Sequence, residues 1–158
     1  MKTNAVRVLD QLGIAYKLLS YEVDPDDLAA ENTAAKVGIV PDQLFKTLVV
    51  KGDRTGVCLA VIPSNMHLDP KALAKLTGDR KVDPVPLKEV QPLTGYIRGG
   101  VTAMACKKEY PVYVEEIVEL YDEIAVSAGM RGLLVQLAPA DYLKAVKATV
   151  GAIAQVKE

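Results

Sequence analysis

The sequence contains few of the residues that most enzymes use as bases or nucleophiles. Its 158 residues include one histidine, His67, and two cysteines, Cys58 and Cys106. A serine or cysteine nucleophile needs a base beside it, and we expect His67 to be a solvated residue in a loop before a helix. The cysteines lie far apart without CxxC spacing, so we expect two free thiols. An enzyme built on this chain would therefore have to work by binding, orientation and electrostatics, or recruit a group from its substrate.

Other scarce features argue against several classes of ligand. With one histidine and no cysteine close to it, the chain lacks the four N or S ligands of a structural zinc site, so we expect no metal. No Walker loop or dinucleotide-binding glycine fingerprint is present, and we expect no nucleotide cofactor. Tryptophan is absent and phenylalanine occurs once, which argues against stacking of single-stranded nucleic acid. Lysine and arginine number 19 against 20 acidic residues, so tight, unspecific nucleic-acid binding is not expected.

Long apolar runs are also missing. No stretch approaches the roughly 20 residues that a helix needs to span a bilayer. The first residues, MKTNAVRVLDQLG, alternate charged with apolar side chains and are not typical of a signal peptide. We therefore expect a cytoplasmic protein without a membrane partner.

The apolar segments follow one another with short turns between them, which favours a single domain over residues 1–158. Apolar spacing, capping residues and terminal glycines predict helices at 4–12, 28–37, 69–78 and 139–147. Strands are predicted at 16–22, 112–114 and 152–156, and as two hairpins, 44–50 with 57–63 and 122–128 with 133–138.

Two further regions, one rich in proline and one acidic, have no regular strand pattern. Pro84, Pro86 and Pro92 are expected to break the region around them into short pieces. The acidic run Glu115-Glu116, with Glu119, is expected to form a solvated helix face. The irregular order of helices and strands predicts an α+β fold, with a mixed, mostly antiparallel sheet flanked by helices.

A lysine stands near the start of the apolar run LFKTLVV. Because side chains alternate along a strand, Lys46 shares one face with Leu44 and Leu48, while Thr47 shares the other with Phe45 and Val49. Lys46 can lay its methylenes on apolar neighbours and keep its ammonium in water. Alternatively, it places a positive charge at the mouth of an apolar pocket, where it can hold a phosphate or a polarised carbonyl. The residues alone leave both readings open.

Two glycine sets also have two readings. Gly99-Gly100 and Gly129-Met130-Arg131-Gly132 are each typical of a hairpin turn that needs positive φ. Either set can also let the backbone approach a ligand, so that N–H groups face an anion or a carbonyl. The second set adds a guanidinium from Arg131.

These signals occur in a recognisable order. The segments DQLFKTLVV, TGYIRGGVTAMACKK and VSAGMRGLLVQLAPADYL resemble the YbaK/EbsC family, and the resemblance covers nearly the whole chain. This family belongs to the prolyl-tRNA synthetase editing-domain superfamily, whose members hydrolyse wrongly charged tRNA. The YbaK branch clears Cys-tRNA carrying the proline anticodon. The resemblance implies a barrel-like, mixed-sheet α+β domain and the aminoacylated 3′ end of tRNA as substrate. It also makes prolyl-tRNA synthetase a candidate partner.

The resemblance further implies a site and a mechanism. Lys46 and Gly100 are assigned to catalysis, and Lys46 contacts the aminoacyl-adenosine end. The expected substrate-binding residues are Tyr21, Thr47, Gly99, Ser127, Gly129, Arg131 and Gly132. In the YbaK branch the substrate's own cysteine thiol attacks its ester carbonyl, which fits a chain without a base. Cys58 and Cys106 would then be bystanders.

The sequence departs from the family pattern at two places. An acidic residue that follows the RG of the second loop in the YbaK branch is missing here, where the chain reads LLVQ. The glycine pair is followed by Val101-Thr102-Ala103 instead of the frequent Ser-Pro. Both changes make the pocket less polar and leave two alternatives open: an Ala-tRNA deacylase of the same superfamily, or a noncatalytic module that binds an aminoacyl-adenosine or nucleotide.

Overall fold

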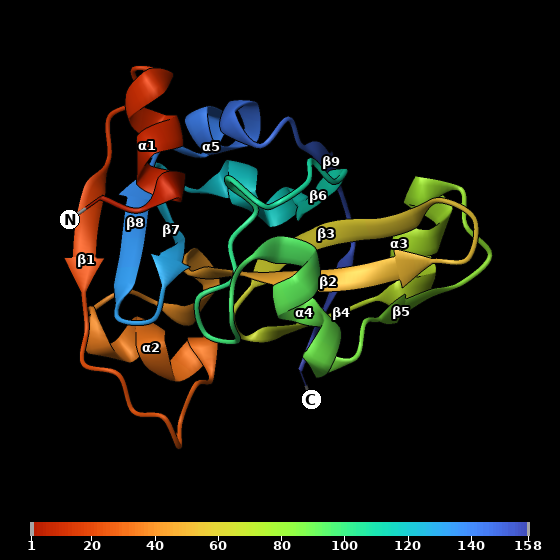
Figure 1. The fold of residues 1–158 in the computed structure, drawn as a ribbon, viewed down its shortest axis with the longest axis horizontal. Helices are drawn as coiled ribbons and strands as arrows, with labels where there is room; N and C mark the ends of the chain where they lie inside the picture. The colour runs from red at the N-terminus through yellow and green to blue at the C-terminus, as the bar shows by residue number, and fades with distance from the viewer. Residues whose placement is uncertain (1, 158) are drawn as a thin grey trace.

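The protein, described here from a computed structural model over residues 2–157, folds into three β-sheets with helices packed around them (Figure 1). The helices are α1 (Asn4–Gln11), α2 (Ala30–Lys36), α3 (Pro70–Thr77), α4 (Leu87–Thr94) and α5 (Pro139–Ala145), with 3-10 turns η1 (Pro41–Gln43) and η2 (Glu116–Leu120). The strands are β1 (Lys17–Ser20), β2 (Phe45–Gly52), β3 (Gly56–Pro63), β4 (Met66–Leu68), β5 (Val82–Pro84), β6 (Val112–Glu115), β7 (Ile124–Met130), β8 (Leu133–Leu137), β9 (Thr149–Gly151) and β10 (Ala154–Val156).

The largest sheet has the order β5-β2-β3-β6-β9, the second β1-β8-β7, and the smallest β10-β4. Pairing is antiparallel except for β3 with β6 and β6 with β9. A parallel bridge between Leu44 and Ala125 links the start of β2 to β7. The predicted α+β class with mostly antiparallel pairing is confirmed, but within residues 2–157 the sheets do not close into a single barrel.

The hairpin of β2 and β3 separates two hydrophobic cores. Phe45 and Val49 face the main core, which also holds Leu9 and Tyr142 from the helices. Val50, on the other face of β2, joins a second core that includes residues of β3 and α3. A third cluster packs α2 against Leu44 and the β7–β8 sheet. Each apolar face on β2 and β3 is thus covered by another element.

Local signals set the ends of α3 as the sequence predicts. The Asp69 side chain accepts from the N–H of Ala72 at 3.1 Å, and Pro70 occupies the first turn, where its missing N–H costs nothing. Gly78 ends the helix in the left-handed region with φ +86°.

The prolines divide this region into short pieces, as expected, at Pro84, which ends β5, and at Pro86, which precedes α4, but Pro92 does not break the chain. α4 runs from Leu87 to Thr94 with Pro92 inside it. Proline removes one backbone donor, but Pro92 lies only two residues before the last residue of the helix, where Gly95 closes it with an N–H to Gln91 O bond of 2.8 Å. Within residues 2–157, the structure contains no helix with the length and apolar content needed to cross a membrane.

His67 and the C-terminal strand also differ from the prediction. His67 is exposed, as expected, but it lies in β4 and pairs in register with Gln155 of β10. The predicted strand over 152–156 is shortened to its last three residues, which form β10, while β9 precedes the predicted range and belongs to a different sheet. Such pairing between distant segments has no local signal in the sequence.

The prediction that Glu115 lies on a solvated helix face is wrong. Its side chain is 3% exposed, while Glu116 and Glu119 are exposed. One carboxylate oxygen accepts the N–H groups of Ile153 and Ala154, each at 3.0 Å, and the other accepts that of Ile117 at 2.9 Å. A buried carboxylate requires such donors, and it fixes the chain where β9 leads into β10.

Replacing Glu115 with alanine should leave these N–H groups without their acceptor. We expect the free energy of unfolding to fall by about 3 kcal/mol, as for the loss of charge-assisted bonds at a buried site. Urea denaturation measures the change, and Glu119→Ala, at an exposed position of the same segment, is the control. Equal stability of the two variants would contradict the structural role of Glu115.

Candidate functional site

The two glycine sets of the sequence pack directly against each other. A Cβ placed on Gly100 would lie 3.1 Å from Cα of Met130 and 3.2 Å from N of Arg131. A Cβ on Gly129 would lie 3.1 Å from Cε1 of Tyr96 in the other segment. Because backbone cannot yield to an added side chain as a flexible group can, the position of Gly100 excludes larger residues.

Arg131 ties the two segments together. Its Nε donates to the carbonyl of Arg98 at 2.8 Å, and a Cβ on Gly99 would meet that same Nε at 3.2 Å. The neighbourhood of Gly99 also includes Leu28, in the segment that leads into α2. The guanidinium thus spans from the β7–β8 turn to the glycine pair.

A positive φ angle explains why glycine occupies most of these positions. Gly99, Gly129 and Gly132 have φ of +89°, +99° and +89°, which side chains other than glycine rarely adopt. The β7–β8 register shifts between Ser127 and Met130, and the Ser127 hydroxyl accepts the Gly129 N–H at 3.1 Å. The bulge directs the turn toward the glycine pair.

The hydrogen bonds of the glycine pair change which amides can serve a ligand. The N–H of Gly100 already donates to the carbonyl of Ile97 at 2.9 Å. The N–H groups of Gly99 and Val101 have no hydrogen-bond acceptor within the described residues 2–157. The amides of Gly99 and Val101 are therefore among the free donors of this loop, whereas that of Gly100 is occupied and Gly100 contributes through its lack of a side chain.

Tyr21 lies beside the second turn. Its N–H donates to the Gly132 carbonyl at 3.0 Å, and its ring carries the Lys36 ammonium 5.9 Å from the ring centre. Contacts along the chain of neighbours therefore connect Tyr21, Ser127 and both glycine sets.

Lys46 lies on the face of β2 that Leu48 and Val50 share, opposite Ile62 of β3. Its side chain is partly buried, and that burial lowers the pKa of the ammonium, with a further lowering from Lys157 and an opposing effect of Glu31. Within residues 2–157 it forms no hydrogen bond or ion pair. A partly desolvated, unpaired ammonium attracts an anion more strongly than one in bulk water.

Lys46 and Thr47 do not point to the same place. Thr47 leaves β2 on the opposite face, toward the main core, where it neighbours the buried hydroxyl of Tyr142. Lys46 approaches the glycine turns only indirectly, across α2: Glu31 of α2 acts on its charge, and Leu28, three residues earlier, neighbours Gly99. No hydrogen bond joins Lys46 to either turn within the described range.

The sequence did not single out Leu28, Glu31 or Lys157. Glu31 lies in the first turn of a predicted helix, where an acidic side chain usually serves only to stabilise the helix N-terminus. Lys157 carries no motif, and its neighbours come from elsewhere in the chain. Only the assembled fold brings Glu31 to Lys157 and Leu28 to Gly99.

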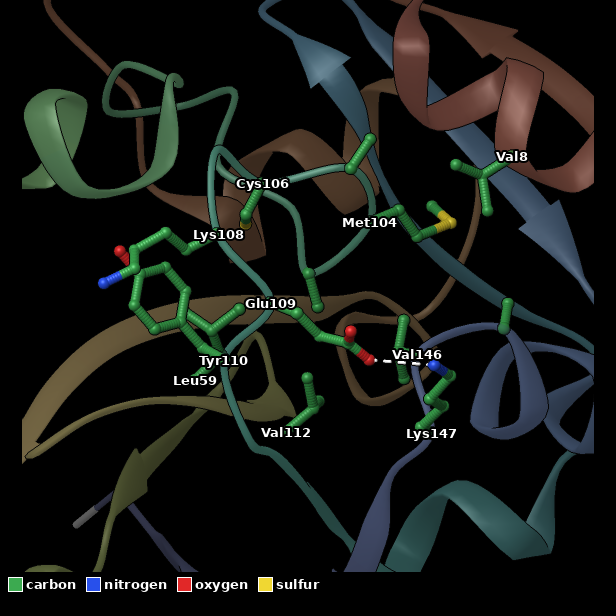
Figure 2. Close-up of a pocket in the computed structure, with 13 residues that line it drawn as sticks. Val8, Leu59, Met104, Cys106, Lys108, Glu109, Tyr110, Val112, Val146 and Lys147 are labelled. Carbon is green, nitrogen blue, oxygen red and sulfur yellow. Dashed lines mark hydrogen bonds and ion pairs between the residues drawn. The ribbon is translucent and has the colours of Figure 1, made fainter. Parts of the chain in front are cut away.

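A separate pocket of about 260 Å³ lies between α1, α5 and the segment 103–110 (Figure 2). Cys106 and Met104 line it, and an ion pair of 2.9 Å between Glu109 and Lys147 stands at one side. Another, of about 320 Å³, lies beside Lys51 and Glu89. Neither contains any of the nine predicted site residues.

Both thiols are poor nucleophiles. Burial raises the pKa of Cys58 and of Cys106 to about 11 in each case. At neutral pH they are therefore protonated, and the thiol form is unreactive.

Known proteins are similar to this chain in sequence and in fold. Residues 24–145 match the family described as the aminoacyl-tRNA editing domain. A protein of Enterococcus faecalis, named as a candidate Cys-tRNA(Pro)/Cys-tRNA(Cys) deacylase EbsC, is 45% identical over 138 residues, which cover 87% of this chain and 84% of that protein. The Escherichia coli K12 multifunctional Ser/Thr-tRNA deacylase ProXp-y is 28% identical over 144 residues, 88% of this chain and 84% of that protein.

A solved structure agrees. A crystal structure described as a candidate trans-editing enzyme for prolyl tRNA synthetase superposes with a TM-score of 0.83 at 25% identity, covering 98% of this chain and 99% of that one. The family match covers more than half of the chain and the Enterococcus relative most of it. The chain therefore belongs to the family of aminoacyl-tRNA editing domains and is an aminoacyl-tRNA deacylase of the YbaK/EbsC type.

Proposed function

We propose that this trans-editing deacylase removes cysteine from Cys-tRNA(Pro), and that the cysteine thiol of the substrate is the nucleophile. The observation that carries the proposal is Lys46: its ammonium is partly desolvated and, within residues 2–157, unpaired. Such a group is prepared to bind a phosphate or an ester carbonyl of the aminoacylated 3′ end. The name of the Enterococcus relative, which is 45% identical, supports cysteine as the amino acid.

The reaction needs no nucleophile from the protein. The substrate sulfur attacks its own ester carbon, the bond to the terminal ribose oxygen breaks, and the thiol proton goes to that oxygen as tRNA leaves. Water then opens the cyclic thiolactone and releases cysteine. Intramolecular attack in a well-oriented substrate can contribute about 7–11 kcal/mol toward the barrier.

The side chains of this protein are consistent with a reaction in which the substrate supplies the nucleophile. His67 is exposed on β4, and both protein thiols are held protonated, with pKa of about 11. The chain therefore lacks a histidine or thiolate suited to act as base or nucleophile at the glycine turns. Its contribution would be Lys46 for charge and the amides of Gly99 and Val101 for the developing oxyanion.

The two glycine turns would hold the terminal adenosine and the amino acid. In this proposal, Arg131 and Gly132 border the substrate from the β7–β8 turn, and Ser127 and Gly129 shape that turn from within. Tyr21 offers a ring beside it. Thr47 lies on the opposite face of β2 from Lys46, and in this proposal it supports the strand and does not touch the substrate.

Prolyl-tRNA synthetase would supply the affinity that the chain lacks. The formal net charge is −1, which gives little general attraction for a polyanion. The solved structure described as a trans-editing enzyme for that synthetase supports this partner. We propose that the synthetase presents the mischarged tRNA to the site.

Other amino acids remain alternatives for the same site. Alanine has no thiol, so its removal would require a positioned water. Serine and threonine are removed by the Escherichia coli relative, according to its name, but that protein is only 28% identical. A pocket that distinguishes amino acids by one methylene gains only about 1–3 kcal/mol, so the thiol must decide the preference.

A panel of mischarged tRNAs tests the chemistry. We expect Cys-tRNA(Pro) to be deacylated at least tenfold faster than Ser-tRNA(Pro) or Ala-tRNA(Pro), because the hydroxyl is a weaker nucleophile and alanine has none. Deacylation is followed by loss of radiolabelled amino acid, with and without prolyl-tRNA synthetase. The variant with both Cys58→Ala and Cys106→Ala should retain the rate. Equal rates for alanine and cysteine would exclude the thiol mechanism.

Replacing Lys46 tests the proposed electrostatic role. Lys46→Ala should lower kcat/KM about 10²–10³-fold, as does removal of one preorganised group facing developing charge. Lys51→Ala, at an exposed position of the same strand, is the matched control and should leave kcat/KM within about twofold. Circular dichroism and thermal unfolding verify that both variants fold. A Lys46→Ala enzyme as active as the control would refute the assignment.

The contact between the turns gives another test. Gly100→Ala should force the backbones of the two turns apart, and a displacement near 1 Å can cost about 10²-fold in rate. Gly13→Ala is the control, since Gly13 has φ +68° but no atom within 4 Å of the added Cβ. The control should lose stability but keep its deacylation rate. A similar effect of both substitutions on activity would show that the approach of the turns is unimportant.

A further inference from the structure

We propose that Arg98 binds a phosphate group in the single-stranded 3′ end of the tRNA, with Arg131 beside it as a second contact. The inference rests on the proposed placement of the aminoacyl end at the glycine turns, but not on cysteine as the amino acid. Arg98 has no role in the chemistry at the ester. Its contact would hold the nucleotides that precede the terminal adenosine.

Arg98 lies in a loop whose backbone is fixed on both sides of it. The N–H of Gly100 donates to the carbonyl of Ile97 at 2.9 Å and closes the loop around Arg98. Just before the loop, the hydroxyl of Tyr96 donates to the carbonyl of Met104 at 2.6 Å. The backbone therefore presents Arg98 at a defined place beside the β7–β8 turn.

Arg131 is joined to Arg98 by a direct hydrogen bond. Its Nε donates to the Arg98 carbonyl at 2.8 Å, and its Cγ lies 3.3 Å from the place that a Cβ on Gly99 would occupy. These contacts hold the guanidinium against the loop. Its two terminal amino groups form no hydrogen bond within residues 2–157, so they can donate to a phosphate.

Neither guanidinium is neutralised by a carboxylate. Arg98 is exposed and Arg131 is partly buried. Within residues 2–157, the basic residues in ion pairs are Lys2, Lys81, Lys147 and Lys157. The side chain of Arg98 also forms no hydrogen bond in this range. A phosphate could bind both arginines without displacing another anion.

The charges around the turns favour a direct contact over attraction at a distance. Val23 lies 3.2 Å from the place of a Cβ on Gly132, and its segment, 22–27, carries the carboxylates of Glu22, Asp24, Asp26 and Asp27. These neighbours and the net charge of −1 weaken the long-range pull on a polyanion. Arginine makes short, forked bonds to phosphate, which such surroundings require.

Exposed apolar side chains lie at the same two turns. Ile97 precedes Arg98 and is 46% exposed, and Met130 precedes Arg131 and is 40% exposed. Both meet at Gly100, whose N–H binds the Ile97 carbonyl and whose added Cβ would lie 3.1 Å from Cα of Met130. Cations beside apolar groups suit a single strand, which offers phosphates and unpaired bases. This combination favours nucleotides of the tRNA over a free phosphate ion.

A comparison of two substrates tests the inference. One is Cys-tRNA(Pro), and the other is 3′-O-cysteinyl-adenosine, which has the same ester and no phosphodiester. Arg98→Ala should lower the ratio of kcat/KM for the tRNA to that for the nucleoside about tenfold, as for loss of a charge-assisted hydrogen bond. The substitution keeps the Arg98 carbonyl, so the bond from Arg131 remains. An unchanged ratio refutes the inference.

Salt dependence identifies the partner as a phosphate. In Arg98→Ala, the slope of log kcat/KM for the tRNA against log salt concentration should become shallower by about 0.7, the value for one phosphate on a single strand. Arg98→Lys should keep the slope, because it keeps the charge, and should recover part of the ratio. A lower ratio with an unchanged slope in Arg98→Ala would indicate contact with a base and would refute phosphate binding.

Arg80→Ala is the matched control. Arg80 is also an exposed arginine, and it lies between α3 and β5, which Figure 1 shows at the other end of the molecule from the β7–β8 turn. The control should leave the ratio and the slope unchanged. Equal effects of Arg80→Ala and Arg98→Ala would show a general effect of charge and would exclude a specific contact.

A binding measurement separates this inference from the proposed function. The probe is tRNA(Pro) that carries cysteine through an amide bond in place of the ester, titrated with the protein and followed by fluorescence anisotropy. The unaltered protein should bind it about tenfold more tightly than Arg98→Ala does. That result without deacylation of Cys-tRNA(Pro) refutes the function and supports the inference. Equal affinities, with Cys-tRNA(Pro) deacylated, refute the inference alone.

Discussion

The alternation of side chains along β2 is the constraint on which the arrangement of this protein depends. β2 pairs with β3 from Phe45 to Gly52 without a bulge, so its two faces are fixed for the whole strand. One face contributes Phe45 and Val49 to the main core, and the other contributes Val50 to the second. Lys46 must then leave the strand on the side of the second core, beyond its apolar part. A one-residue slip would exchange Lys46 with Thr47 and place an ammonium among buried apolar residues.

The chemistry of the family is carried out here by a scaffold with few reactive groups. Two carboxylates have structural partners: Glu115 binds backbone N–H groups and Glu31 binds Lys157. In the proposed mechanism, the groups that the chain contributes are a partly desolvated ammonium, two free amides and the close approach of two turns. Such tools stabilise charge and orient a substrate, which suffices when the substrate brings its own nucleophile.

Individual elements show which parts of the fold could be predicted from neighbouring residues alone. α3 could be predicted from Asp69, Pro70 and Gly78, because a capping side chain and a left-handed glycine act within a few residues. The two hairpins could be predicted for the same reason. The burial of Glu115 could not, because its donors are supplied by Ile153 and Ala154, 38 and 39 residues later. Nor could the role of His67 in a strand, since β4 exists only through its pairing with β10.

The sequence by itself determined the α+β class, the main hairpins and the glycine turns, because period-two alternation and positive-φ glycines are local properties of the chain. Through its motifs it also determined the family. The tertiary structure alone decided that Gly100 meets the backbone of Met130 and has its own amide occupied. It alone brought Lys157 to Glu31, because interactions between charges depend on distance in space and not on separation along the chain.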